Sequence, residues 1–139
     1  MILLDTSGLL AAIDAAQRHH AGAASSLAAA QPPLVVSPFV LAELDYLVLT
    51  RVGAAARANV LAEVARGAYL LAPFDNADVA RADVIVSRYA DLAISLADAS
   101  IVVLAERHGV RDVLTLDERH FRVLTTSDGE PLRLLPADA

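Results

Sequence analysis

Four acidic residues stand at the ends of apolar segments or inside them, where a carboxylate needs a partner. They are Asp5, Glu43, Asp98 and Asp117. Carboxylates held close together repel one another and raise some of their pKa values, and a divalent cation removes that repulsion. Carboxylate oxygens suit Mg²⁺ or Mn²⁺, ions that can activate water for attack on a phosphodiester bond. If the fold brings these residues together, the sequence predicts an acidic metal site with hydrolytic chemistry.

Asp5 and Asp117 each end a short apolar strand. Asp5 follows MILL, Asp117 follows DVLTL, and a helix is expected directly after each. In parallel α/β sheets, ligands bind at the carboxyl ends of the strands. If the two strands are neighbours, their carboxylates face each other. Either residue could instead cap its helix, although Thr6 and Ser7 could take over that role beside Asp5.

Glu43 and Asp45 share one apolar helix. The residues three and four positions from Glu43 are largely apolar, and burying a carboxylate is costly unless a metal ion or a hydrogen-bond donor accompanies it. Alternatively, Glu43 lies on a solvated edge of the helix. The register alone does not decide which of the two acids points inward.

Asp98 lies near the start of a helix among small residues, in the segment LADAS. Small neighbours let a ligand or a backbone segment approach closely. A carboxylate near a helix start also interacts favourably with the helix dipole. Asp98 is therefore compatible with both a site and a purely structural role.

The other polar residues indicate no competing chemistry. The histidines His19, His20, His108 and His120 lack the HxxxH or HExxH spacing of a zinc hydrolase, and no GxGxxG or GxxxxGK[ST] loop is present. His120 is close to Asp117 and could assist substrate binding, but a surface role is the preferred interpretation. Four further aspartates are interpreted as solvated: Asp75, Asp78, Asp83 and Asp91.

Composition limits the class of protein. The 139 residues suit one domain, residues 1–139, and no apolar run approaches the ~20 residues of a membrane span. We therefore expect a soluble, cytoplasmic protein with no membrane partner. Without cysteine, thiolate metal sites and cysteine nucleophiles are excluded. The net charge of −6 argues against a general nucleic-acid coat protein, but not against a nuclease whose acids gather in one site.

Short apolar strands alternate with longer helical segments. The expected strands are Ile2–Leu4, Leu34–Val36, Tyr69–Leu71, Val113–Leu116 and Leu132–Leu135. The expected helices are Ser7–Ala15, His19–Ala30, Pro38–Val52, Ala54–Arg66, Asn76–Tyr89 and Ser95–His108, with a short one from Glu118. Nearly continuous apolar strands indicate a parallel sheet covered on both faces. The predicted fold is an α/β three-layer sandwich with a central, mainly parallel sheet.

The sequence resembles PIN-domain ribonucleases, and more narrowly the VapC toxins of VapBC toxin–antitoxin pairs. The resemblance rests on four ordered blocks that span nearly the whole chain: MILLDTSGLLA, VVSPFVLAELDYLV, LADASIVVLAER and VLTLDERHF. It implies a PIN-like fold and an acidic site made by Asp5, Glu43, Asp98 and Asp117, with Asp5 and Asp98 as the strongest metal ligands. It also selects Glu43 over Asp45.

The resemblance further implies Mg²⁺-dependent hydrolysis of RNA, with Mn²⁺ also accepted, homodimerisation and inhibition by a cognate VapB-type antitoxin. An acidic surface fits a partner that covers it with a basic segment. Transfer RNA and ribosomal RNA are both candidate substrates, and Arg51, Arg119 and Arg122 are the candidate RNA contacts.

Two rival interpretations use the same acids. Asp5 could be the nucleophile of a phosphoryl-transfer domain, although DTSG has no second aspartate two positions on and the chain has no lysine to hold a phosphate. Alternatively, the acids could hold a structural cation in a non-catalytic RNA-binding module.

Overall fold

The computed structural model describes residues 1–139, and its centre is a five-stranded sheet in which every pairing is parallel. The strands are β1 (Ile2–Leu4), β2 (Leu34–Val36), β3 (Leu70–Leu71), β4 (Asp112–Leu114) and β5 (Arg133–Leu135), in the spatial order β3-β2-β1-β4-β5. The first and fourth strands are therefore neighbours, which is the condition stated above for Asp5 and Asp117 to face each other.

Seven α-helices connect the strands. They are α1 (Thr6–Ile13), α2 (His20–Ala29), α3 (Pro38–Arg51), α4 (Ala54–Ala65), α5 (Asn76–Arg88), α6 (Leu96–His108) and α7 (Glu118–Phe121), with a 3₁₀ turn at Ala90–Leu92 between α5 and α6. Each helix and strand predicted from the sequence is present, with ends that agree to within two residues.

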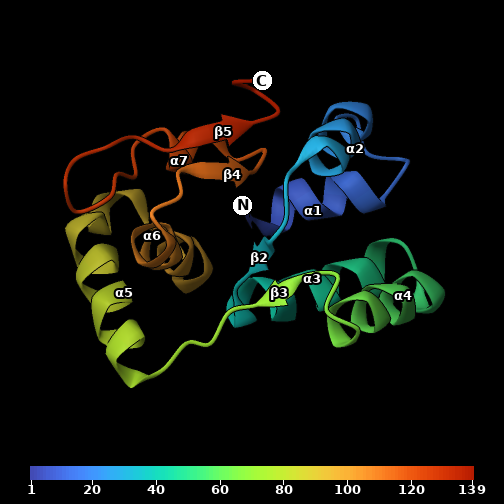
Figure 1. The fold of residues 1–139 in the computed structure, drawn as a ribbon, viewed down its shortest axis with the longest axis horizontal. Helices are drawn as coiled ribbons and strands as arrows, with labels where there is room; N and C mark the ends of the chain where they lie inside the picture. The colour runs from blue at the N-terminus through green and yellow to red at the C-terminus, as the bar shows by residue number, and fades with distance from the viewer.

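The helices form outer layers on the two faces of the sheet. Figure 1 shows α1, α2 and α4 on one side and α5 and α6 on the other. The three-layer α/β sandwich predicted from the sequence is confirmed. The chain adds strands outward from β1 to β3 and then returns through α5 and α6 to place β4 on the other side of β1. The order of the strands thus reverses between β1 and β4, which is where such sheets place ligands.

Burial departs from the expected pattern at two places. The sheet was expected to be covered on both faces, but Leu70 and Leu71 are 43% and 44% exposed, because β3 is an edge strand that pairs only with β2. Asp78 was expected to be solvated, but it is buried. Its carboxylate accepts from the backbone of Asp75 at 3.0 Å and from Arg107 Nη2 at 2.5 Å, and these hydrogen bonds lower its pKa.

The start of α1 packs directly against the end of β4. Gly8 is buried there, and a Cβ atom at this position would overlap the carbonyl oxygen of Leu114. Only glycine lets the helix approach the strand this closely. The sequence DTSG thereby fixes α1 beside the carboxyl end of β4.

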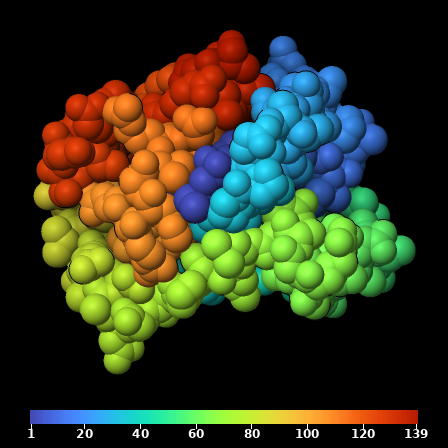
Figure 2. Space-filling model, viewed as in Figure 1, coloured from blue at the N-terminus to red at the C-terminus, as the bar shows by residue number.

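The C-terminal segment packs against α2. Figures 1 and 2 show the C-terminal segment beside α2, and Pro136 lies against Gly22 of that helix. None of the helices has the length and apolar content needed to cross a membrane.

Candidate active site

The pairing of β1 with β4 joins two of the predicted site residues to one edge of the sheet. Leu4 is in register with Leu114, and the backbone N–H of Asp5 donates to the Leu114 carbonyl at 3.0 Å. Asp5 and Asp117 therefore follow neighbouring strands at their carboxyl ends. This is the arrangement expected from the sequence.

Asp5 is buried and held by two hydroxyl groups. The residue is 5% exposed, and its Oδ2 atom accepts hydrogen bonds from Ser7 at 2.6 Å and from Thr115 at 2.8 Å. It makes no capping hydrogen bond to α1. Thr6 and Ser7 do not cap the helix as expected, since Ser7 binds Asp5 and the buried Thr6 hydroxyl has no partner.

The surroundings of Asp5 disfavour its charge. Burial raises its pKa above the ordinary value of 3.8, the hydrogen bonds from Ser7 and Thr115 oppose that rise, and the charge of Asp98 adds to it. Asp98 is thus close enough to act electrostatically on Asp5, although the two carboxylates share no hydrogen bond. A cation between them would offset both the free-energy cost of burying the charge of Asp5 and its repulsion with Asp98.

Asp98 is placed by the first turn of α6. Ser95 precedes the helix and forms a reciprocal capping box with it: the Ser95 hydroxyl accepts from the Asp98 N–H at 3.0 Å, and Asp98 Oδ2 accepts from the Ser95 N–H at 3.1 Å. Asp98 is nevertheless 8% exposed, and burial is the main cause of its raised pKa, with a further contribution from Asp117. The structural and functional interpretations of Asp98 are therefore compatible.

Asp98, Asp117 and His120 form a group of potential metal ligands. One ligand atom from each residue lies within 4.8 Å of the others. Asp117 caps α7 by accepting from the His120 N–H at 3.0 Å. The His120 ring then turns back, with Nδ1 2.9 Å from Asp117 Oδ2 and 3.4 Å from Asp98 Oδ2.

His120 is the residue that sequence reasoning undervalued. A surface role was preferred, but its side chain is only 20% exposed and lies among the acids. The available signal was its position, three residues after an aspartate that ends a strand and begins a helix, because side chains at that spacing lie on one helix face.

Glu43 lies apart from this group. It is exposed on α3, it forms no hydrogen bond or ion pair, and it is not among the ligands within 4.8 Å. Asp45 is committed elsewhere: its carboxylate pairs with Arg57 of α4 at 2.5 and 3.1 Å. Of the two acids on this helix, Glu43 is the one free to face a ligand.

A buried pair of serines ties α3 to α6. Ser37 caps α3 by accepting from the Val40 N–H at 3.1 Å, and the Ser100 hydroxyl of α6 donates to Ser37 Oγ at 2.8 Å. This contact fixes the helix that carries Glu43 relative to the helix that carries Asp98.

The candidate RNA-contacting arginines differ in their freedom. Arg122 binds both Glu118 and Asp138, whereas Arg51 and Arg119 form no ion pair.

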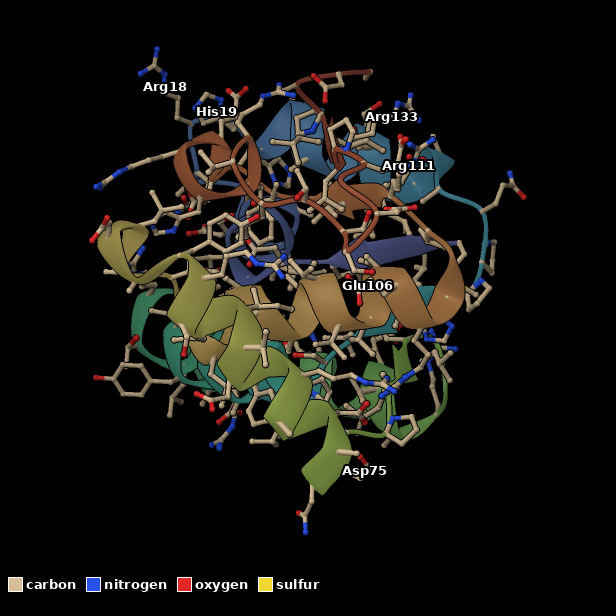
Figure 3. All side chains as sticks on the ribbon, turned by 90° about the vertical axis from the view of Figure 1, so that its left-hand side faces the viewer. Arg18, His19, Asp75, Glu106, Arg111 and Arg133 are labelled. Atoms are coloured by element: carbon tan, nitrogen blue, oxygen red, sulfur yellow. The ribbon has the colours of Figure 1, made fainter.

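Figure 3 shows Arg111 and Arg133 together near one end of the sheet and Arg18 with His19 at the opposite end. Arg111 and Arg133 are paired with Glu130 and Asp112, and so are partly neutralised.

A separate apolar cavity of about 270 Å³ lies between α1, α3 and α4, lined mainly by hydrophobic side chains such as Leu9, Val60 and Tyr69. It contains none of the acids described above, and it has no set of converging polar groups. The acidic edge of the sheet, and not this cavity, is therefore the candidate active site.

The residues at that edge fit a divalent cation. Two buried carboxylates with raised pKa values, a third carboxylate and an imidazole nitrogen lie at this edge, and the hydroxyl of Thr6, which follows Asp5 in the chain, is buried without a partner. Carboxylate oxygens are the ligands that Mg²⁺ and Mn²⁺ prefer. The donor set therefore suits a metal ion better than a buried cluster of free charges.

Comparison with known proteins agrees with this geometry. Residues 2–125 match the PIN domain family. The chain is 47% identical over 135 residues to ribonuclease VapC26 of Mycobacterium tuberculosis. The aligned region covers 97% of this chain and 100% of that protein. The fold is similar to the crystal structure of M. tuberculosis VapC20, a sarcin–ricin loop cleaving toxin, with a TM-score of 0.78, 22% identity, and coverage of 84% of this chain and 90% of that one. The chain belongs to the PIN domain family, within the group of VapC ribonucleases.

Proposed function

We propose that this chain is a metal-dependent endoribonuclease that hydrolyses RNA phosphodiester bonds and acts as the toxin of a toxin–antitoxin pair. The observation that carries the proposal is the convergence of Asp98, Asp117 and His120 within 4.8 Å, beside the buried Asp5. The 47% identity to ribonuclease VapC26 supports the reaction class.

In this proposal, Asp5 and Asp98 hold the cation, and Asp117 and Glu43 complete the pocket. A bound Mg²⁺ would activate the attacking water and offset the charge that develops on the phosphate and the leaving oxygen. Mn²⁺ would serve in the same place.

The protein's own contribution is positioning. Ser7 and Thr115 hold Asp5 through one oxygen, and the capping box with Ser95 holds Asp98, so neither carboxylate must reorganise when a ligand arrives. Carboxylates fixed in this way stabilise a bound ion or a transition state more than mobile ones do, because the entropy of ordering them has already been lost on folding.

We assign Glu43 a role at the rim of the pocket, although it lies apart from the group of Asp98, Asp117 and His120. It is unpaired and exposed, and the Ser37–Ser100 contact fixes its helix against α6. From there it can receive a proton from water or orient an approaching phosphodiester. Both tasks suit an exposed carboxylate better than a buried one, since its charge stays solvated.

The substrate class is RNA, with ribosomal and transfer RNA as the two candidates. VapC20, which shares the fold, is described as cleaving the sarcin–ricin loop, and this favours testing ribosomal RNA first. The unpaired Arg51 and Arg119 remain the candidate contacts to RNA phosphates, while the two ion pairs of Arg122 make it a weaker candidate.

The partners proposed are a VapB-type antitoxin and a second copy of this chain, with action in the cytoplasm. The net charge of −6 supports an antitoxin segment that is basic. Tyr46 and Leu49 on α3 and Val52 directly after it are exposed, which supports further burial on assembly. Light scattering coupled to size-exclusion chromatography would give the oligomeric state.

The direct test is cleavage of 5′-labelled RNA by the purified chain with Mg²⁺, Mn²⁺, Ca²⁺ or EDTA. We expect cleavage with Mg²⁺ and Mn²⁺ but not with Ca²⁺ or EDTA. Asp5→Asn and Asp98→Asn should lose cleavage while they keep the circular dichroism spectrum of the wild type. Cleavage by both variants at the wild-type rate in EDTA would rule out the metal site.

Two further measurements separate the alternatives. Stoichiometric trapping of Asp5 with beryllofluoride would favour phosphoryl transfer, and RNA binding without cleavage under any metal would favour a non-catalytic module. Sequencing of the RNA ends that appear after induced expression would identify the RNA and the cleaved bond.

A further inference from the structure

His120 has an unusual contact with the acids around it. Its Nδ1 atom is inaccessible to solvent and lies 2.9 Å from Asp117 Oδ2, yet it forms no hydrogen bond of acceptable geometry. The distance suits a hydrogen bond, so the failure is one of direction: no carboxylate oxygen lies in line with the ring nitrogen. The same holds for Asp98 Oδ2 at 3.4 Å.

Ligands of one metal ion show this pattern. Each donor directs its lone pair at the common centre and therefore does not point at the neighbouring donors. For bonds of about 2.1 Å, adjacent ligands of an octahedral ion are about 3 Å apart. The separations of 2.9 and 3.4 Å between Nδ1 and the two carboxylate oxygens are close to that spacing.

The ring is held in this position by its place in the fold. The His120 N–H donates to Asp117 Oδ1 at 3.0 Å, and the next residue, Phe121, is 1% exposed in the core. These contacts fix the part of α7 that carries the imidazole, and the His120 side chain itself is largely buried, at 20% exposed. A side chain with so little free space around it can act as a ligand at low entropic cost.

We propose that His120 is a metal ligand through Nδ1, which makes this centre a mixed nitrogen–oxygen site selective for transition-metal ions over Mg²⁺. The inference rests on the proposed metal dependence and extends it to the identity of the ion. Imidazole binds borderline ions such as Mn²⁺ and Co²⁺ better than it binds Mg²⁺, which strongly prefers oxygen.

The test uses MnCl₂ and the purified full-length chain. Electron paramagnetic resonance measures free Mn²⁺ and hence the Kd, and electron spin-echo envelope modulation detects a nitrogen atom bonded to Mn²⁺. The wild type should show ¹⁴N modulation that changes when all histidines are labelled with ¹⁵N. In His120→Gln the modulation should vanish and the Kd for Mn²⁺ should rise about tenfold or more, whereas the Kd for Mg²⁺, measured by competition, should change less.

His108→Gln is the matched control, since His108 on α6 also has a buried ring nitrogen without a partner but is not in the acidic group. It should keep both the modulation and the Kd. Mn²⁺ binding without ¹⁴N modulation would overturn the role of His120 and leave the acidic metal site intact. Absence of Mn²⁺ binding at millimolar concentration would overturn the proposed metal dependence as well. The labelled wild type gives a result even if His120→Gln does not fold.

Discussion

The hydroxyl of Thr115 donates to Oδ2 of Asp5 at 2.8 Å, across 110 positions of the chain. The contact exists because β1 and β4 are parallel neighbours whose carboxyl ends coincide. Thr115 also receives the Asp117 N–H at 3.0 Å, so a single side chain sets the position of two of the acids.

Thr115→Val should therefore reduce RNA cleavage by roughly 10–100-fold, the usual effect of removing a hydrogen-bond partner of a metal ligand. The valine keeps the shape of the buried side chain, so the circular dichroism spectrum should not change. Thr115→Ser retains the hydroxyl and should keep most of the activity. If Val and Ser variants cleave at equal rates, the hydroxyl does not position Asp5.

Asp5→Asn should stabilise the protein in EDTA at neutral pH. Because burial raises the pKa of Asp5 above 3.8, the native state binds the proton more tightly than the unfolded state does, and wild-type stability falls as pH rises through the raised value. The asparagine does not titrate, so the difference in unfolding free energy should open above pH 3.8 and then become constant. Urea titrations at several pH values measure it.

Metal should stabilise the wild type more than Asp5→Asn. A cation that binds the native wild type raises its unfolding free energy by mass action, and loss of one ligand should weaken this effect in Asp5→Asn. Equal stabilisation of both proteins by Mn²⁺ would mean that Asp5 is not a ligand.

Sequence patterns predicted the fold well, because the relevant signals are local. The apolar run MILL forms β1, and the helices predicted to begin at Pro38 and to end at His108 do so. The parallel orientation of the strands was predicted from their near-continuous apolar character.

The site was harder to predict, because its contacts join residues that are far apart in the sequence. The sequence around Asp78 does not predict its ion pair with Arg107. The sequence around His120 does not predict its contact with Asp98, because that contact depends on how α6 and α7 pack together. Whether Glu43 or Asp45 is free was decided by Arg57 on the next helix, which a helical pattern cannot show.

The two acids of α3 should have different roles: Glu43→Gln should affect RNA cleavage, and Asp45→Asn should affect stability. Glu43 forms no contact, so its glutamine variant should unfold like the wild type but lose most of its cleavage activity. Asp45→Asn breaks a partly exposed ion pair with Arg57, which typically costs about 0.2–1 kcal/mol, and should still cleave RNA. Thermal unfolding and cleavage rates of both variants check this, and the reverse outcome would make Asp45 the functional acid.

Gly8→Ala should damage the fold. The added Cβ would overlap the Leu114 carbonyl and push α1 away from β4, at a cost of about 1–3 kcal/mol that exceeds the ~1 kcal/mol gained from helix propensity. Gly22→Ala on α2 is the control, because its Cβ would lie 3.4 Å from the ring of Pro136 and should fit. Chemical denaturation should show a loss of stability for Gly8→Ala alone, and equal stability of the two variants would contradict the close approach.

Arg119→Ala should weaken RNA binding without affecting the fold. Arg119 is exposed on α7 between Asp117 and His120 and forms no ion pair, so it is free to contact a phosphate. Losing one such contact should reduce the slope of log K against log salt by about 0.7 for single-stranded RNA. Binding should be measured in the Asp98→Asn background to prevent cleavage. Arg66→Ala is the matched control, because Arg66 is already paired with Glu63 at 2.5 Å on α4. An unchanged slope for Arg119→Ala would place the RNA-binding surface elsewhere.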